Sequence, residues 1–300
     1  MSRLYVILDV FADRPLAGNP LAVVLDARGL DAAGMQAIAR EFNLSETVFL
    51  LPAEDESRKA WLRIFTPDRE LPFAGHPTVG TAVLLGLMDA VAGKGRDATF
   101  ELEEAVGVVP CRAAATGKRS GRATFVLPKL PAPAGPVPDV AAAAAALGLD
   151  PADIGFEGHA PSCFDAGNLF AFVPVSGLDA LARLRPDLAR WDAAFAGDAR
   201  RAAFVYTRET GDPGQAFRAR MVRGSFEDPA TGSAVAAFAG AVMAFDRPGN
   251  GEHALKIGQG YEMGRPSVIE LGLRVSEGRL ASATIGGSAV VVAEGSLFLP

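Results

Sequence analysis

Two short segments of the chain carry residue types that suit the binding of an anion and the transfer of a proton. His76 stands directly before Pro77, and Asp228 stands directly before Pro229. Proline is favoured at the first position of a helix, so we predict that a helix begins at each proline, with His76 and Asp228 at the capping positions. A helix start exposes free backbone N–H groups and the positive end of the helix dipole. Each segment therefore predicts a place where a carboxylate could bind.

The two capping residues differ in how strongly they suggest chemistry. Aspartate is a common helix cap, so Asp228 taken alone is more simply interpreted as a cap. Histidine is not a preferred cap, and His76 therefore needs another explanation. Because His76 and Asp228 occupy matched positions in two similar segments, a functional role is favoured for both.

Glu46 is the third candidate for proton transfer. It opens a predicted strand, residues 46–51, that is largely apolar on both faces and is therefore expected to be buried. A partly desolvated carboxylate there would have a raised pKa, in the range that suits acid–base chemistry. The alternative is a glutamate at the end of a strand that reaches solvent, and position in the sequence does not separate the two.

The two segments belong to an internal repeat. Aligned on the proline, residues 73–83 and 225–235 share Pro, Gly, Ala and Val, and Thr81 meets Ser233. A second correspondence, at nearly the same offset, joins residues 18–19 to residues 167–168, where Gly-Asn precedes an apolar strand. The repeat predicts a duplicated fold with pseudo-two-fold symmetry. In such a fold both helix starts would face one cleft between the halves, and a small carboxylate is the expected occupant.

The elements that must position these residues alternate short strands with single helices. We predict strands at residues 4–10, 21–25, 46–51, 61–65, 99–102, 123–127, 169–175, 204–206, 217–222, 268–275 and 288–299. Helices are predicted after a cap at Asp31, at residues 78–88, at residues 140–147 after a cap at Asp139, and at residues 230–245. This alternation is typical of an α+β fold rather than a doubly wound parallel sheet.

The length of 300 residues suggests two domains, each large enough to bury a core. Residues 128–138 are rich in proline and can continue neither a helix nor a central strand, so they are the predicted linker. The expected domains are residues 1–128 and residues 139–287. Residues 288–299 have no counterpart in the first half, and we expect them to pair with the first domain.

Composition excludes several classes of protein and site. The chain has 29 basic and 35 acidic residues, a net charge of −6, which argues against nucleic acid or an anionic membrane as a partner. Its 2 cysteines and 3 histidines are too few and too widely spaced for a disulfide scaffold or a common metal motif. We find neither a signal-peptide pattern nor an apolar stretch long enough to span a bilayer, so we expect a cytoplasmic protein with no metal.

Three segments together carry a family resemblance. They are Ser45-Glu46-Thr47, Glu70-Leu71-Pro72-Phe73-Ala74-Gly75-His76-Pro77-Thr78 and Glu227-Asp228-Pro229-Ala230-Thr231-Gly232-Ser233-Ala234. Further fitting segments are Arg63-Ile64-Phe65-Thr66-Pro67, Gln259-Gly260, Gly264-Arg265-Pro266-Ser267 and Gly286-Gly287-Ser288-Ala289-Val290. With these motifs the chain resembles the phenazine biosynthesis PhzF-like family, from about Asp9 to about Gly295.

The resemblance implies a diaminopimelate-epimerase-like fold, in which two pseudo-symmetric domains each wrap a sheet or open barrel around a central helix. It also implies a cofactor-independent isomerase, usually a homodimer, similar to the enzyme that isomerises trans-2,3-dihydro-3-hydroxyanthranilate. Glu46 would be the general acid and base, with His76 and Asp228 as its catalytic partners. The residues that would contact the substrate are Gly75, Thr78, Thr231, Gly232 and Ser233.

Two other functions stay open on the same fold. One is an epimerase or racemase of a small amino or hydroxy acid, and the other is a protein that binds a small ligand without catalysis. Related epimerases use a pair of cysteines, one from each half, as opposed bases. Here Cys111 and Cys163 lie away from the paired helix starts. An isomerase with one catalytic carboxylate is therefore favoured over a racemase with two thiols.

Overall fold

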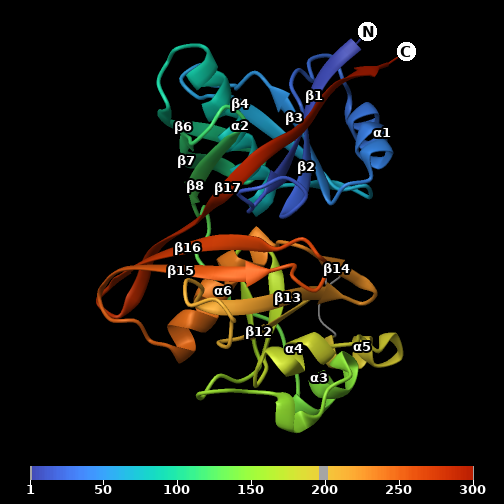
Figure 1. The fold of residues 1–300 in the computed structure, drawn as a ribbon, viewed down its shortest axis with the longest axis vertical. Coiled ribbons are helices and arrows are strands. Elements are labelled where there is room, and N and C mark those ends of the chain that lie inside the picture. The colour runs from blue at the N-terminus through green and yellow to red at the C-terminus, as the bar shows by residue number, and fades with distance from the viewer. Residues whose placement is uncertain (1, 196–201, 300) are drawn as a thin grey trace. The chain divides into compact units, whose positions relative to one another are not determined.

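A computed structural model describes residues 2–195 and 202–299 of the chain (Figure 1). The fold divides into two compact units. One comprises Met1–Pro128 together with Ile285–Pro300, and the other comprises Lys129–Thr284. Both combine β-strands with a few helices, which confirms the predicted α+β class.

The first unit wraps its strands around one helix. Its helices are α1 (Ala32–Phe42) and α2 (Gly75–Val91). Its strands are β1 (Ser2–Val10), β2 (Asn19–Val24), β3 (Glu46–Leu51), β4 (Ala60–Phe65), β5 (Glu70–Leu71), β6 (Asp97–Glu104), β7 (Gly107–Ala115), β8 (Ser120–Val126) and the last part of β17 (Arg279–Phe298). The pairings run β1–β2–β3–β4–β6–β7–β8–β17 and return to β1, so the sheet closes into a barrel.

The second unit repeats this order of pairings. Its helices are α3 (Val140–Leu147), α4 (Leu178–Arg183), α5 (Leu188–Phe195) and α6 (Gly232–Phe245), with a 3₁₀ turn at Pro151–Asp153. Its strands are β9 (Ala132–Pro133), β10 (Ser162–Asp165), β11 (Leu169–Pro174), β12 (Ala203–Thr207), β13 (Phe217–Arg223), β14 (Phe226–Asp228), β15 (Gly251–Gln259), β16 (Ser267–Ser276) and the first part of β17.

The repeat is visible in the direction of each pairing. In the first unit β1–β2 is antiparallel, β2–β3 parallel, β3–β4 antiparallel, β4–β6 parallel and β6–β7 antiparallel. In the second unit β10–β11, β11–β12, β12–β13, β13–β15 and β15–β16 follow the same sequence of directions. The short hairpins β4–β5 and β13–β14 precede α2 and α6 respectively. Two copies of one topology therefore make up the chain.

The two central helices are apolar on all sides because strands surround them (Figure 1). Every residue of α2 from Gly75 to Leu87 is buried. Gly80 allows α2 to lie close to strand β1, because a Cβ at this position would lie 2.6 Å from a methyl group of Val10. In α6, Phe238 packs its ring against four others, those of Phe172, Phe204, Tyr206 and Phe217.

Several predicted elements are confirmed and others were missed. The strand at residues 46–51 and the Asp139 cap, whose side chain accepts from two backbone N–H groups of α3, are as expected. The predicted strand 288–299 is the end of the longer strand β17, whose residues from Ala289 pair with β1. Helices α4 and α5 were not predicted: they have only 6 and 8 residues, and α4 lacks a side-chain cap of the kind that marks the similarly short α3.

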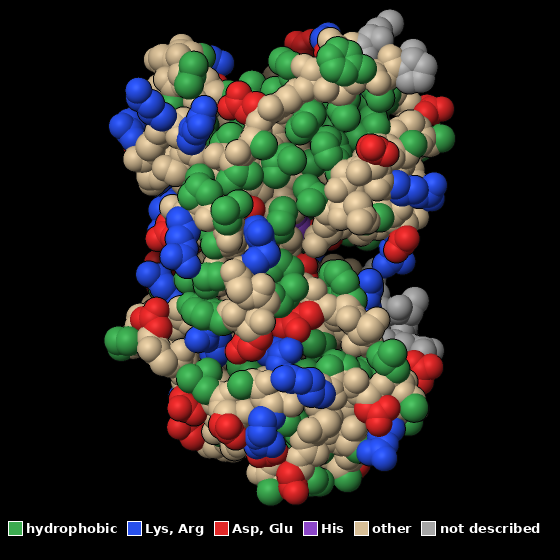
Figure 2. Space-filling model, turned by 45° about the vertical axis from the view of Figure 1, so that its right-hand side comes forward, with side chains coloured by type: hydrophobic (Ala, Val, Ile, Leu, Met, Phe, Trp, Pro, Cys, Tyr) green, Lys and Arg blue, Asp and Glu red, His purple; other side chains and the backbone are tan. Residues whose placement is uncertain are grey.

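None of the helices in the described ranges is long and apolar enough to cross a membrane. On the face shown in Figure 2, Lys and Arg side chains are interspersed with Asp and Glu side chains and with apolar ones.

Candidate active site

The central helix of the first unit begins earlier than predicted. Ala74, in an extended conformation, is its N-cap, and its carbonyl oxygen accepts from the Thr78 N–H at 3.2 Å and from the Thr78 hydroxyl at 2.8 Å. His76 is therefore the second residue of α2, and the prediction that it caps the helix is wrong. The physical reason is that a proline costs no hydrogen bond anywhere in the first turn, so Pro77 fits the third position.

The central helix of the second unit begins later than predicted. Asp228 ends β14, where it pairs with Met221, and α6 starts only at Gly232. The cap is Thr231, whose carbonyl oxygen accepts from the N–H groups of Ala234 and Val235. The prediction that Asp228 caps this helix is wrong, because strand pairing holds it and a short link separates it from α6.

The structure brings Glu46 and His76 together. Glu46 is the first residue of β3 and pairs with Leu21 of β2. Its Oε2 atom lies 3.4 Å from Nε2 of His76, and both side chains are largely buried. On the other side of the imidazole, Nδ2 of the buried Asn19 lies 3.5 Å from Nδ1. The barrel wall and the first turn of the enclosed helix thus hold a carboxylate beside an imidazole.

The imidazole of His76 is neutral at physiological pH. Burial lowers its pKa to about 3, and a hydrogen bond to the Pro20 backbone opposes this only in part. A neutral imidazole offers one donor and one acceptor nitrogen. The contact between Glu46 and His76 is therefore a polar contact between a carboxyl group and a neutral ring, rather than an ion pair.

This protonation state can be measured directly. We expect the imidazole carbon shifts of His76 to stay those of a neutral ring between pH 8 and pH 5, with His76→Asn used to assign the signal. Because the folded pKa lies below the unfolded value of about 6.5, the unfolded state takes up a proton first as the pH falls. The contribution of His76 to stability is then lost from about pH 6.5 downwards. A titration centred near pH 6.5 would contradict this assignment.

The second cluster is built around the link between β14 and α6. The Asp228 carboxylate accepts from the Thr231 hydroxyl at 2.5 Å. Gln259, at the end of β15, is fully buried and clamps both residues. Its amide oxygen accepts from the Thr231 N–H at 3.0 Å, and its amide nitrogen donates to the Asp228 carbonyl at 2.8 Å and the Thr231 hydroxyl at 3.1 Å.

The turn after β15 and the start of β16 also contact the link between β14 and α6. Ser267 donates its hydroxyl to the Pro229 carbonyl at 3.0 Å. Gly260 has φ +78°, and a Cβ there would come within 2.5 Å of the Pro229 carbonyl oxygen. Only glycine tolerates both conditions, which explains the Gln259-Gly260 segment. The sequence does not indicate a role for Gln259 or Ser267, because their partners lie 28 and 38 residues away.

The expected substrate-contacting residues lie in or beside the first turns of the two central helices. Gly75 and Gly232 are the first residues of α2 and α6, and both are buried. The hydroxyls of the buried Thr78 and Thr231 are engaged within the protein, in the bonds to Ala74 and Asp228. Ser233 is only partly buried and lies in the first turn of α6. Its hydroxyl and the free N–H groups of the first turns are thus the groups best suited to contact a ligand.

Neither cysteine is suited to act as a base. Cys111 and Cys163 are both buried and lie in strands β7 and β10 rather than at a helix start. Burial raises the pKa of the Cys163 thiol to about 11, and burial together with Glu104 raises that of Cys111 further. Among the residues that the structure describes, no three His, Cys, Asp or Glu side chains are grouped so that they could hold a metal ion.

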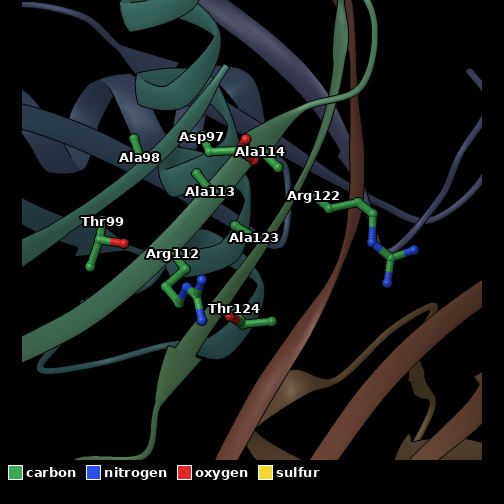
Figure 3. A pocket seen from close by; sticks show the side chains of 9 residues that line it. All are labelled: Asp97, Ala98, Thr99, Arg112, Ala113, Ala114, Arg122, Ala123 and Thr124. Carbon is green, nitrogen blue, oxygen red and sulfur yellow. The ribbon is translucent and has the colours of Figure 1, made fainter. Parts of the chain in front are cut away.

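Two hollows lie on strand faces away from these clusters. One, of about 280 Å³, is lined by residues of β6, β7 and β8, among them the exposed Arg112 and Arg122 (Figure 3). The other, of about 440 Å³, occupies the corresponding place on β15, β16 and β17. Since neither is lined by Glu46, His76 or Asp228, they are features of the repeated sheet rather than the candidate site.

Nearly the whole chain matches one known family. Residues 8–295 match the model described as phenazine biosynthesis-like protein, PhzC-PhzF. The chain belongs to this family. An uncharacterised isomerase of Mesorhizobium japonicum is 51% identical over 99% of each chain. The trans-2,3-dihydro-3-hydroxyanthranilate isomerase of Pseudomonas aeruginosa is 34% identical, over 98% of this chain and 99% of the relative.

Solved structures confirm the predicted fold of this phenazine biosynthesis-like protein. A PhzF-family protein of Bacillus anthracis superposes with a TM-score of 0.87, at 24% identity and over 100% of both chains. A hydroxyproline epimerase of Agrobacterium vitis superposes with a TM-score of 0.61, at 15% identity, over 99% of this chain and 92% of the other. At identities of 24% and 15%, these superpositions show that the folds are alike and carry no argument about function. The enzyme class, isomerase, is supported by the names of the sequence relatives.

Proposed function

We propose that the protein is a cofactor-independent isomerase that moves a proton between two carbons of a small, carboxylate-bearing substrate. The observation that carries the proposal is the contact of Glu46 Oε2 with Nε2 of the buried His76, 3.4 Å apart, at the start of α2. A carboxylate beside a neutral imidazole can accept a proton and be held in one orientation. The start of a buried helix beside it supplies N–H groups for an anion.

Glu46 would carry the proton. Its carboxylate takes the proton from an activated C–H bond, and the electron pair of that bond moves along the conjugated system of the substrate. The protonated Glu46 then returns the proton to another carbon, where the electron pair forms the new C–H bond. Atoms and electrons balance within the substrate, and Glu46 ends as it began. His76 holds the Glu46 carboxyl through its ring nitrogen.

Asp228 is proposed as a further group that contacts the substrate. The hydrogen bond from Thr231 and the clamp of Gln259 fix its position. A carboxylate so held can accept a hydrogen bond from an amino or hydroxyl group of the substrate. The first-turn N–H groups at Gly75 are suited to bind a carboxylate, and so are those at Gly232 with the Ser233 hydroxyl.

We take trans-2,3-dihydro-3-hydroxyanthranilate as the first substrate to test, because relatives that are 34% to 36% identical bear the name of its isomerase. The assay follows the change of double-bond absorbance and, in D₂O, the position of deuterium in the product by NMR. An isomerase shifts the absorbance. Exchange at one stereocentre with no shift would instead indicate an epimerase or racemase, and binding without exchange or shift would indicate a non-catalytic protein.

We also propose that the protein acts as a homodimer. Leu4 of β1 is 61% exposed and Phe298 of β17 is 87% exposed. Strand pairing of Ser2 with Phe298 and of Leu4 with Ser296 puts both apolar side chains on one face of the sheet. Sedimentation should give twice the chain mass of 31.2 kDa, and Phe298→Ser should weaken the association. A monomer at micromolar concentration would overturn this proposal.

A further inference from the structure

A buried carboxyl group that the proposed mechanism does not use lies beneath the start of α2. Glu104 is the last residue of β6 and is 5% exposed. Its Oε1 atom lies 2.7 Å from the Thr78 hydroxyl oxygen. Its other oxygen is buried and has no hydrogen-bond partner among the described residues. An ionised carboxylate would be costly in such a place, because a buried charge needs partners.

Both short contacts of the Thr78 hydroxyl can be hydrogen bonds only if Glu104 carries a proton. The Thr78 hydroxyl has one proton and lies 2.8 Å from the Ala74 carbonyl oxygen, which can only accept. If the hydroxyl donates to Ala74, it can only accept from Glu104. The short contact to Glu104 is then satisfied only if Glu104 carries a proton. The geometry thus favours a relay from the Glu104 carboxylic acid through Thr78 to the carbonyl that caps α2.

The second unit places an amide at the equivalent position. In the parallel pairing of β4 with β6, Ala60 faces Leu102, and in that of β13 with β15, Phe217 faces Ile257. Ala60 and Phe217 are the first residues of β4 and β13, so Leu102 and Ile257 are matched positions. Glu104 and Gln259 each follow their matched position by two residues, at the ends of β6 and β15.

Gln259 also donates to a threonine hydroxyl at the helix start, since its amide nitrogen lies 3.1 Å from Oγ1 of Thr231. The Gln259 amide cannot ionise. Glu104 occupies the equivalent position in the first unit. Both units therefore brace the helix start with a residue that can act as a neutral donor.

The surroundings of Glu104 favour the neutral form. Burial raises its pKa to about 8, and a hydrogen bond donated by Thr78 to the ionised form would offset this rise only in part. The elements packed against β6 are β4, β7 and α2, and none of their titratable side chains places an unpaired charge beside Glu104. His76 and Cys111 are kept neutral by burial. Asp89 is paired with Lys59, Arg63 is paired with Glu70, and Arg112 lies on the outer face of the sheet. The neighbouring Glu103 is by contrast paired with Arg58 at 2.7 Å.

We infer that Glu104 is a neutral carboxylic acid that positions the first turn of α2, and with it His76, by donating its proton to Thr78. Ionisation would reverse the relay, because the carboxylate would draw the Thr78 proton away from the Ala74 carbonyl. The bracing of the turn that carries His76 would weaken. Glu104 is therefore a positioning residue whose effect disappears in alkaline solution. The inference concerns the free protein and does not depend on the substrate.

A test without substrate uses infrared spectroscopy. At pH 6 the protein should show the carbonyl band of a buried protonated carboxylic acid, which disappears as the pH rises through about 8. The band should be missing in Glu104→Gln. The matched control is Glu103→Gln, which should leave it unchanged, because hydrogen bonds from backbone N–H groups and Arg58 keep the pKa of Glu103 low. A protein without a band sensitive to Glu104→Gln would overturn the inference.

The positioning role is tested by comparing two replacements. Glu104→Gln keeps a donor, so the His76 imidazole shifts and the turnover at pH 7 should stay near those of the parent. The parent should lose turnover as the pH rises above about 8, and Glu104→Gln should not. Glu104→Met fills the space without a donor and should lower kcat about tenfold with less effect on KM. Equal losses in both variants would overturn the role. If no turnover is found at all, the proposed function fails, while the infrared band and the His76 shifts still decide this inference.

Discussion

Glu46→Gln is expected to lower kcat/KM about 10²- to 10⁴-fold, the range that a positioned proton-transfer group contributes. The amide has nearly the shape of the carboxylate and can still contact the His76 ring, but it cannot accept a proton. The loss should appear mainly in kcat, because the replacement removes an interaction made only in the transition state. Turnover of trans-2,3-dihydro-3-hydroxyanthranilate under saturating conditions measures it.

The control for this replacement is Glu252→Gln, which makes the same chemical change on an exposed strand residue and should leave turnover unchanged. Both variants should keep the melting temperature of the parent to within a few degrees, because Glu46 retains 17% exposure and loses no buried ion pair. If Glu46→Gln turns over as fast as the parent, proton transfer by Glu46 is excluded.

Gln259→Leu is expected to have the largest effect on stability. The change leaves the buried Thr231 N–H and the buried Asp228 carbonyl oxygen without the partners seen here. An unsatisfied buried polar group costs about 1–3 kcal/mol, so the loss of the Thr231 acceptor should lower the free energy of unfolding by about that much, and the lost hydrogen bond to Asp228 should add to it. Urea denaturation measures this loss. The link that carries Asp228 should loosen as well, and kcat should fall with it.

Gln259→Glu is the matched control for this second prediction. It keeps the shape of the side chain and converts the position into the counterpart of Glu104. At low pH the protonated carboxyl can still donate to the Asp228 carbonyl or to the Thr231 hydroxyl, so the variant should be more stable at pH 5 than at pH 9. This follows because the folded pKa of a buried acid is raised, and stability is lost as the pH rises towards it. A Gln259→Leu variant as stable as the parent would show that the clamp contributes nothing.

The features that the sequence predicted well are those set by neighbouring residues. The apolar run after Glu46 predicts a buried strand, and the structure buries each residue from Thr47 to Leu50. Asp139 before a run of alanines predicts a capped helix, and its carboxylate accepts from two N–H groups. The repeat of motifs predicts two copies of one fold, and the strand pairings repeat in the same order.

The helix starts were misplaced because proline fixes only its own backbone. Pro77 fits the third position of α2 as well as the first, and the carbonyl of Ala74 decides the boundary through Thr78. The chain bends at Pro229 and α6 starts only at Gly232, since Asp228 is held in a strand by Met221. Such long-range pairing leaves no trace in the local pattern, and tertiary context overrides it.

Gln259 and Glu104 were overlooked for a similar reason. Each lies at the end of a strand, 28 and 26 residues from the threonine that it contacts. Nothing in the neighbouring sequence distinguishes a buried glutamate that carries a proton from one that reaches solvent, as Glu103 and Glu104 themselves show. Only the register of β4 with β6 and of β13 with β15 reveals that the two residues are equivalent.

The central claim is that one carboxylate, that of Glu46, moves a proton from one carbon of the substrate to another. The most direct test is to convert trans-2,3-dihydro-3-hydroxyanthranilate in D₂O with the parent and with Glu46→Gln, and to locate deuterium in the product by NMR. We predict that the parent delivers hydrogen or deuterium to one face of one new carbon, with a shifted double bond, and that Glu46→Gln forms no product with a shifted double bond in the same time. Equal formation of the isomerised product by both proteins, or exchange at a single stereocentre without a shifted double bond, would contradict the account.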